Sequence, residues 1–65
     1  MAYVIRVGDI ILFEGKLYSV YKTEGSSVKL LPVKKDRRGY VLDGNARLVS
    51  AVDLVQKAVY KDRIN

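Results

Sequence analysis

Four basic side chains lie within a stretch of five residues near the middle of the chain, and they are its strongest candidates for chemistry. They are Lys34, Lys35, Arg37 and Arg38. Residues 29–47 carry six cations and two anions, a net charge of +4 out of +5 for the whole chain. Lys and Arg neutralise phosphates and release bound counterions, which gives affinity independent of base sequence. The pattern predicts a contact with a polyanion here.

Three further residues fit the same hypothesis. Lys29 and Arg47 are predicted to be flanking phosphate contacts, and Tyr40, just after the basic run, is a candidate for stacking on a base. Tyr18 is a second candidate for stacking, but alternation along a strand leaves its face undecided. The alternative is a solvated basic loop that only keeps the chain in solution. Both interpretations stay open.

Catalytic chemistry finds little support. The chain has no Cys and no His, which excludes a thiol nucleophile, an imidazole base and the usual zinc site. Asp9 and Glu14 are more typical of turn residues than of an acid–base pair. We therefore expect a protein that is not an enzyme and that holds no metal or other cofactor.

Short runs of β-branched and aromatic residues, separated by Gly-containing turns, predict five strands. Pro32 lacks a donor, so the third strand is expected to end there or to lie at an edge. Residues 34–39 are predicted to form a charged loop, and Asp43-Gly44-Asn45 predicts a hairpin between the last two strands. The five strands are expected near residues 10–13, 17–23, 28–31, 40–42 and 46–49.

The pattern changes after the fifth strand. Ser50 precedes Asp53 by three residues, a spacing that predicts a hydroxyl cap and a helical turn over residues 51–55. Val52 and Val55 are expected to cover one end of the core. Residues 57–65 form a tail that adds a strand, extends the helix or frays. We expect residues 1–65 to form a single domain.

Three segments give the chain a resemblance to the SH3-like barrels, including the KOW and Tudor groups. They are Val7-Gly8-Asp9-Ile10-Ile11, Leu17-Tyr18-Ser19-Val20-Tyr21 and the closing run from Leu48 to Val55. The resemblance covers about residues 4–56. It implies an all-β fold, a small five-stranded barrel with one short 3₁₀ or helical turn near the C-terminus. It also implies binding of RNA, DNA, modified tails or Pro-rich peptides rather than catalysis.

The sequence thus favours a small, largely non-sequence-specific nucleic-acid-binding module, with DNA and RNA left open. The alternative is a protein–protein interaction module, such as an adaptor or an inhibitor of mobile-element or phage type, docking on an acidic partner. A self-associating barrel is a third hypothesis, since so small a chain buries only about 60% of its unfolded surface. No leader or long apolar run is present, so we expect a cytoplasmic protein that does not contact the membrane.

Overall fold

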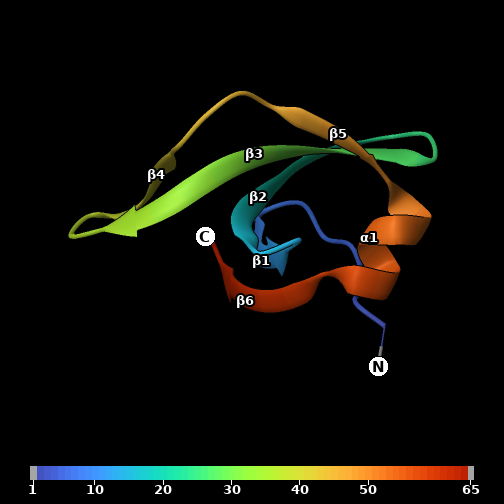
Figure 1. Ribbon diagram of the computed structural model, residues 1–65, viewed down its shortest axis with the longest axis horizontal. Helices are drawn as coiled ribbons and strands as arrows, with labels where there is room; N and C mark the ends of the chain where they lie inside the picture. The colour runs from blue at the N-terminus through green and yellow to red at the C-terminus, as the bar shows by residue number, and fades with distance from the viewer. Residues whose placement is uncertain (1, 65) are drawn as a thin grey trace.

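The computed structural model describes residues 2–64, which form six strands and one helix (Figure 1). All strand pairs are antiparallel. The prediction of a mostly β fold with one short helical element near the C-terminus is confirmed. The elements are β1 (Asp9–Phe13), β2 (Lys16–Glu24), β3 (Ser27–Asp36), β4 (Gly39–Leu42), β5 (Arg47–Ser50), α1 (Ala51–Lys57) and β6 (Val59–Arg63).

The strands form one sheet in the order β4-β3-β2-β1-β6, and β5 also pairs with β3. The sheet curls but does not close within the described residues, because β6 and β4 end the order without pairing with each other. The sixth strand is β6, which the tail forms by pairing with β1. The sequence had left the structure of this tail open.

The hairpin predicted between the fourth and fifth strands is wrong: residues 39–50, which form β4, a link and β5, do not fold back on themselves. β4 pairs with the second half of β3, and β5 pairs with the first half, so the two short strands lie end to end along β3. The link between them bends without reversing: the Asp43 amide donates to the Pro32 carbonyl at 2.7 Å. Gly44, with φ +138°, lies against the Pro32 ring. The ten-residue β3 forms backbone hydrogen bonds with both β4 and β5, whereas two four-residue strands paired only with each other would form a marginally stable hairpin.

β3 also runs through Pro32 as far as Asp36, so the prediction that the strand ends at Pro32 is wrong, and the loop predicted over residues 34–39 is reduced to a turn at residues 37–38. The N–H and C=O of one residue point to the same side of an antiparallel strand. The Pro32 carbonyl faces Asp43 in the link. The missing N–H therefore faces the gap between β4 and β5, where the ladder requires no donor.

The apolar side chains of the curled sheet pack on its inner side. Phe13 and Tyr18 meet edge to face, with ring centroids 6.3 Å apart. Leu54 of α1 packs into the same cluster, so the helix covers one end of it. The main buried members are Ile11, Phe13, Tyr18, Val20, Val28, Leu30, Val49 and Leu54.

The helix differs from its prediction in two respects. Ser50 is the N-cap residue, but its side chain makes no capping hydrogen bond. The first helical amide, that of Ala51, instead donates to the Ser26 carbonyl at 2.8 Å, so a contact with the β2–β3 turn satisfies it. Leu54 is fully buried, whereas Val52, expected to cover the core, is 66% exposed. No helix within residues 2–64 has the length and apolar character needed to cross a membrane.

Candidate nucleic-acid interface

The basic run forms a hairpin that projects from the body of the molecule (Figure 1), and we name residues 33–42 the β3–β4 arm. Its turn consists of Arg37 and Arg38. The Asp36 carboxylate accepts the Arg38 amide at 2.8 Å, and Gly39 takes φ +118°. An acid that caps the turn and a glycine with positive φ are what a tight reversal requires. The cations therefore sit on a paired ribbon.

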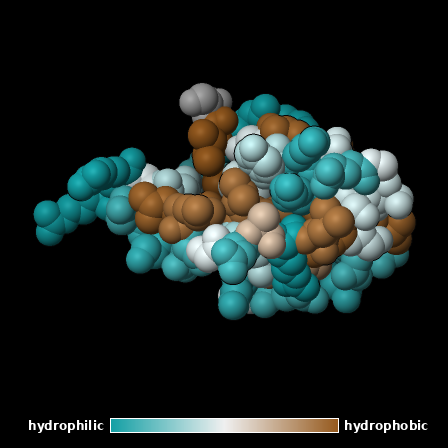
Figure 2. All heavy atoms as spheres, turned by 90° about the horizontal axis from the view of Figure 1, so that it is seen from above, coloured by the Kyte–Doolittle hydropathy of each residue, from teal (hydrophilic) through white to brown (hydrophobic). Residues whose placement is uncertain are grey.

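The four arm cations differ from most other cations in having no ionic partner. Lys34, Lys35, Arg37 and Arg38 are exposed and form no ion pair with any residue that the structure describes. Figure 2 shows the end of the arm as a hydrophilic projection. Five cations of the body do have carboxylate partners: Arg6, Lys22, Arg47, Lys57 and Arg63. Ion pairs with the described residues therefore do not neutralise the positive charge of the arm.

Tyr40 connects the arm to β6. It pairs with Lys35 in the β3–β4 register, and the Lys35 ammonium lies 5.5 Å from the centroid of its ring. The Tyr40 hydroxyl donates to Asp62 at 3.0 Å, and this hydrogen bond raises the pKa of Tyr40. The Arg63 amide and then the Tyr40 hydroxyl lower the pKa of Asp62, with a smaller contribution from the Lys35 charge. Tyr40 thus braces the arm, and its stacking role stays a prediction.

Arg47 lies on the inner side of the sheet, opposite buried Leu30. Its guanidinium is 5.4 Å from the Phe13 ring centroid and 5.9 Å from that of Tyr18. It also donates to the Tyr18 hydroxyl at 3.1 Å and pairs with Glu14. These contacts raise the pKa of Arg47, chiefly through Glu14. The predicted flanking contact therefore already has partners within the chain.

Lys29 is separated from the arm tip. It lies six residues before Lys35 on β3, which corresponds to about 20 Å along the strand. Its register partners are Lys22 and Leu48. The structure brings the four arm cations and Tyr40 together, and it leaves Lys29 at the other end of the strand.

A cleft of about 490 Å³ opens at the base of the arm and adds two residues that the sequence analysis missed. Lys16 and Asn45 line it beside Lys34, Lys35 and Arg47. Tyr18 pairs with Pro32, so Lys16, two residues before Tyr18, shares a face with Lys34, two residues after Pro32. A correct β2–β3 register would have revealed Lys16. No signal in the sequence marked Asn45, which lies in the link after β4.

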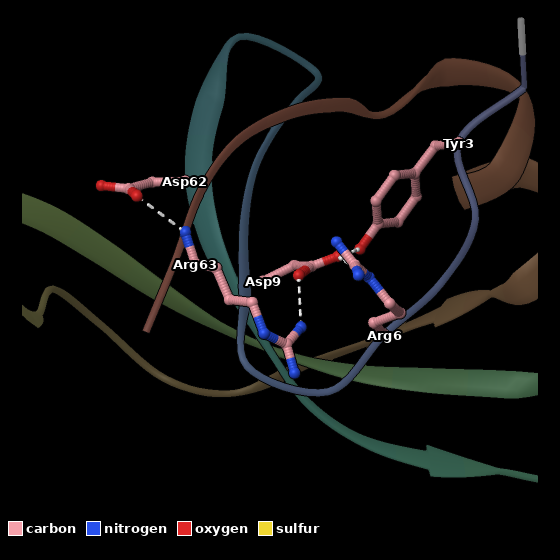
Figure 3. Close-up of polar contacts among 5 residues, drawn as sticks. All are labelled: Tyr3, Arg6, Asp9, Asp62 and Arg63. Atoms are coloured by element: carbon pink, nitrogen blue, oxygen red, sulfur yellow. Dashed lines mark hydrogen bonds and ion pairs between the residues drawn. The ribbon is translucent and has the colours of Figure 1, made fainter. Parts of the chain in front are cut away.

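The buried carboxylate of Asp9 is a second cluster of charged groups (Figure 3). Asp9 has no exposed surface. One oxygen accepts the Tyr3 hydroxyl at 2.7 Å and lies 3.6 Å from Arg6 Nε; the other accepts Arg63 Nη1 at 2.8 Å. Burial, followed by the bond to Asp9, raises the pKa of Tyr3. Both oxygens have partners, so this carboxylate anchors the segments around it.

β6 links the two clusters. Arg63 reaches the buried Asp9, while its neighbour Asp62 accepts the Tyr40 hydroxyl of the arm. Adjacent residues of a strand face opposite sides, which allows one short strand to make both contacts.

Comparisons with protein-family models, with curated proteins and with solved structures find no match for this chain.

The anchoring role of Asp9 predicts a large loss of stability in the Asp9→Asn variant. The neutral amide no longer pairs with Arg63, and one buried donor or acceptor loses its partner. We expect the free energy of unfolding, measured by urea denaturation, to fall by about 2–4 kcal/mol. The control is Asp53→Asn on the surface of α1, whose pair with Lys57 is exposed; its cost is below ~1 kcal/mol. Equal losses in the two variants would refute the anchor.

The Tyr40–Asp62 contact predicts a shift in titration. In the folded state the pKa of Asp62 lies below its ordinary 3.8, so its bonds stabilise the fold above that pH. This contribution is lost as the pH falls through the lowered folded-state pKa. The Tyr40→Phe variant should raise the pKa of Asp62 toward its ordinary value, as followed by NMR of the side-chain carboxyl carbon.

The exposed Tyr21, changed to Phe, is the matched control for loss of a phenol hydroxyl, and it should leave the Asp62 titration unchanged. An Asp62 pKa that does not move in Tyr40→Phe would show that the brace is absent in solution.

Proposed function

We propose that this protein is a nucleic-acid-binding domain of the SH3-like barrel type, with the β3–β4 arm as its phosphate contact. Three features support the fold assignment. β1, β2 and β3 form a meander, β5 pairs back onto β3, and a short helix leads to a last strand that pairs with β1. The last strand, β6, lies beyond residues 4–56, which the resemblance covered, and the arm is an extension of β3.

The observation that carries the proposal is the contrast between the two sets of cations. Most cations of the body form ion pairs with carboxylates of the same chain. The four arm cations form no such pair within residues 2–64. Lys16 extends the basic surface into the cleft at the base of the arm. Phosphates spaced along a backbone supply the opposite charge, and counterion release gives the affinity.

Binding should depend steeply on salt. Three or four phosphate contacts imply a slope of roughly −3 in a plot of log affinity against log salt, or about a 60-fold loss between 50 and 200 mM. The variant with Lys34, Lys35, Arg37 and Arg38 all changed to Gln should lose saturable binding and remain folded. Fluorescence anisotropy of labelled oligonucleotides measures the binding, and circular dichroism checks the fold.

The control variant changes Lys22, Lys57 and Lys61 to Gln. It removes three positive charges from β2, α1 and β6 and should keep its affinity within about threefold. Retained affinity in the arm variant would refute the proposal. So would an equal loss in the control, which would indicate attraction by net charge alone. Saturable, stoichiometric binding to one acidic protein, with no affinity for nucleic acid at low salt, would favour a protein partner instead.

A further inference from the structure

The shape of the arm points to one class of nucleic acid. We infer that the β3–β4 arm enters the major groove of B-form duplex DNA, an inference that rests on the proposed function. The arm is a two-stranded antiparallel ribbon whose turn is Arg37-Arg38. The major groove of B-DNA, about 12 Å wide and about 8.5 Å deep, admits such a ribbon, whereas the minor groove is only about 6 Å wide.

The length of the arm matches the depth of this groove. Four cross-strand pairs lie between Val33↔Leu42 and Asp36↔Gly39, followed by the two turn residues. At about 3.3 Å per residue the turn stands roughly 13 Å beyond the first pair, which exceeds the groove depth. Lys34 and Lys35 lie about 7–10 Å behind the turn, at the height of the phosphates along the groove rim. The two arginines then reach the base edges at the floor.

The two lysines point to opposite faces of the ribbon. Lys34 is paired with Val41 and Lys35 with Tyr40, and adjacent residues of a strand alternate between faces. Packed sheets lie about 10 Å apart, which approximates the thickness of a ribbon with its side chains and fits within the groove. Lys34 therefore meets the phosphate backbone on its side of the ribbon, whereas Lys35 lies on the other face, over the ring of Tyr40. The basic cleft at the arm base extends this contact through Lys16.

Single strands are a poorer match. Proteins that bind them present aromatic rings on which bases stack. Tyr40 is the one aromatic residue among residues 33–42, and it is held by Asp62 with Lys35 over its ring. Duplex RNA is also disfavoured, because its A-form major groove is deep and too narrow for side chains to read. The arm thus favours duplex DNA over both.

The experiment compares three labelled ligands of matched sequence by fluorescence anisotropy at one low salt concentration: duplex DNA, its single strand and duplex RNA. We expect the full chain to bind duplex DNA at least ~10-fold more tightly than either of the others. Methyl green, which occupies the major groove, should displace the protein, and netropsin, which occupies the minor groove of A·T-rich DNA, should not.

Equal or tighter binding of the single strand or of duplex RNA would overturn the groove assignment and leave the proposed function intact. Displacement by netropsin but not by methyl green would do the same. If none of the three ligands binds at low salt, both the groove assignment and the proposed function fail. The variant with the four arm cations changed to Gln serves as the negative control for each ligand.

Discussion

The buried charge of Asp9 is the constraint on which the arrangement of the molecule depends. A carboxylate withdrawn from water is costly unless hydrogen bonds and opposite charge compensate it. Its donors come from both ends of the chain: Tyr3 precedes β1, and Arg63 lies 54 residues after Asp9, on β6. Satisfying this one group therefore holds the N-terminal segment and the last strand against β1. A chain with no cysteine, and hence no disulfide, joins its ends by this means.

β6 connects the buried Asp9 to the arm. Because Arg63 fixes β6 at Asp9, its neighbour Asp62 stands where it accepts the Tyr40 hydroxyl. The arm is therefore attached to the body in two ways: its first strand is the end of β3, and Tyr40 on its second strand is hydrogen-bonded to β6. Arg47 plays the corresponding part at the core, where its guanidinium lies over Phe13 and Tyr18. Cations that pair with carboxylates hold the fold together, whereas the four arm cations form no ion pair with the described residues.

Local patterns in the sequence predicted β1, β2, the first part of β3, β4, β5, the helical element and the basic cluster, but not β6. β-Branched and aromatic runs report directly on strands, and clustered charge needs no fold to be seen. The continuation of β3 through Pro32 to Asp36 was not predicted, because charged residues and Pro32 have low strand propensity and pairing with β4 overrides it. The burial of Asp9 and its pairing with Arg63 were not predicted, because Arg63 is distant in sequence and no residue near Asp9 indicates that it is buried. The hairpin predicted at Asp43-Gly44 is wrong because pairing of β4 and β5 with the long β3 outweighs the local preference for a hairpin.

We propose that the arm is the part of the molecule that contacts nucleic acid. An NMR titration of the ¹⁵N-labelled chain with a short DNA duplex tests it most directly, since every amide reports its own environment. The account predicts that the largest shifts fall on residues 34–38, with smaller ones at Lys16 and Tyr40, while α1 is unaffected. Shifts concentrated on α1 or on the segment from Ala58 to Tyr60, with the arm unchanged, would contradict it.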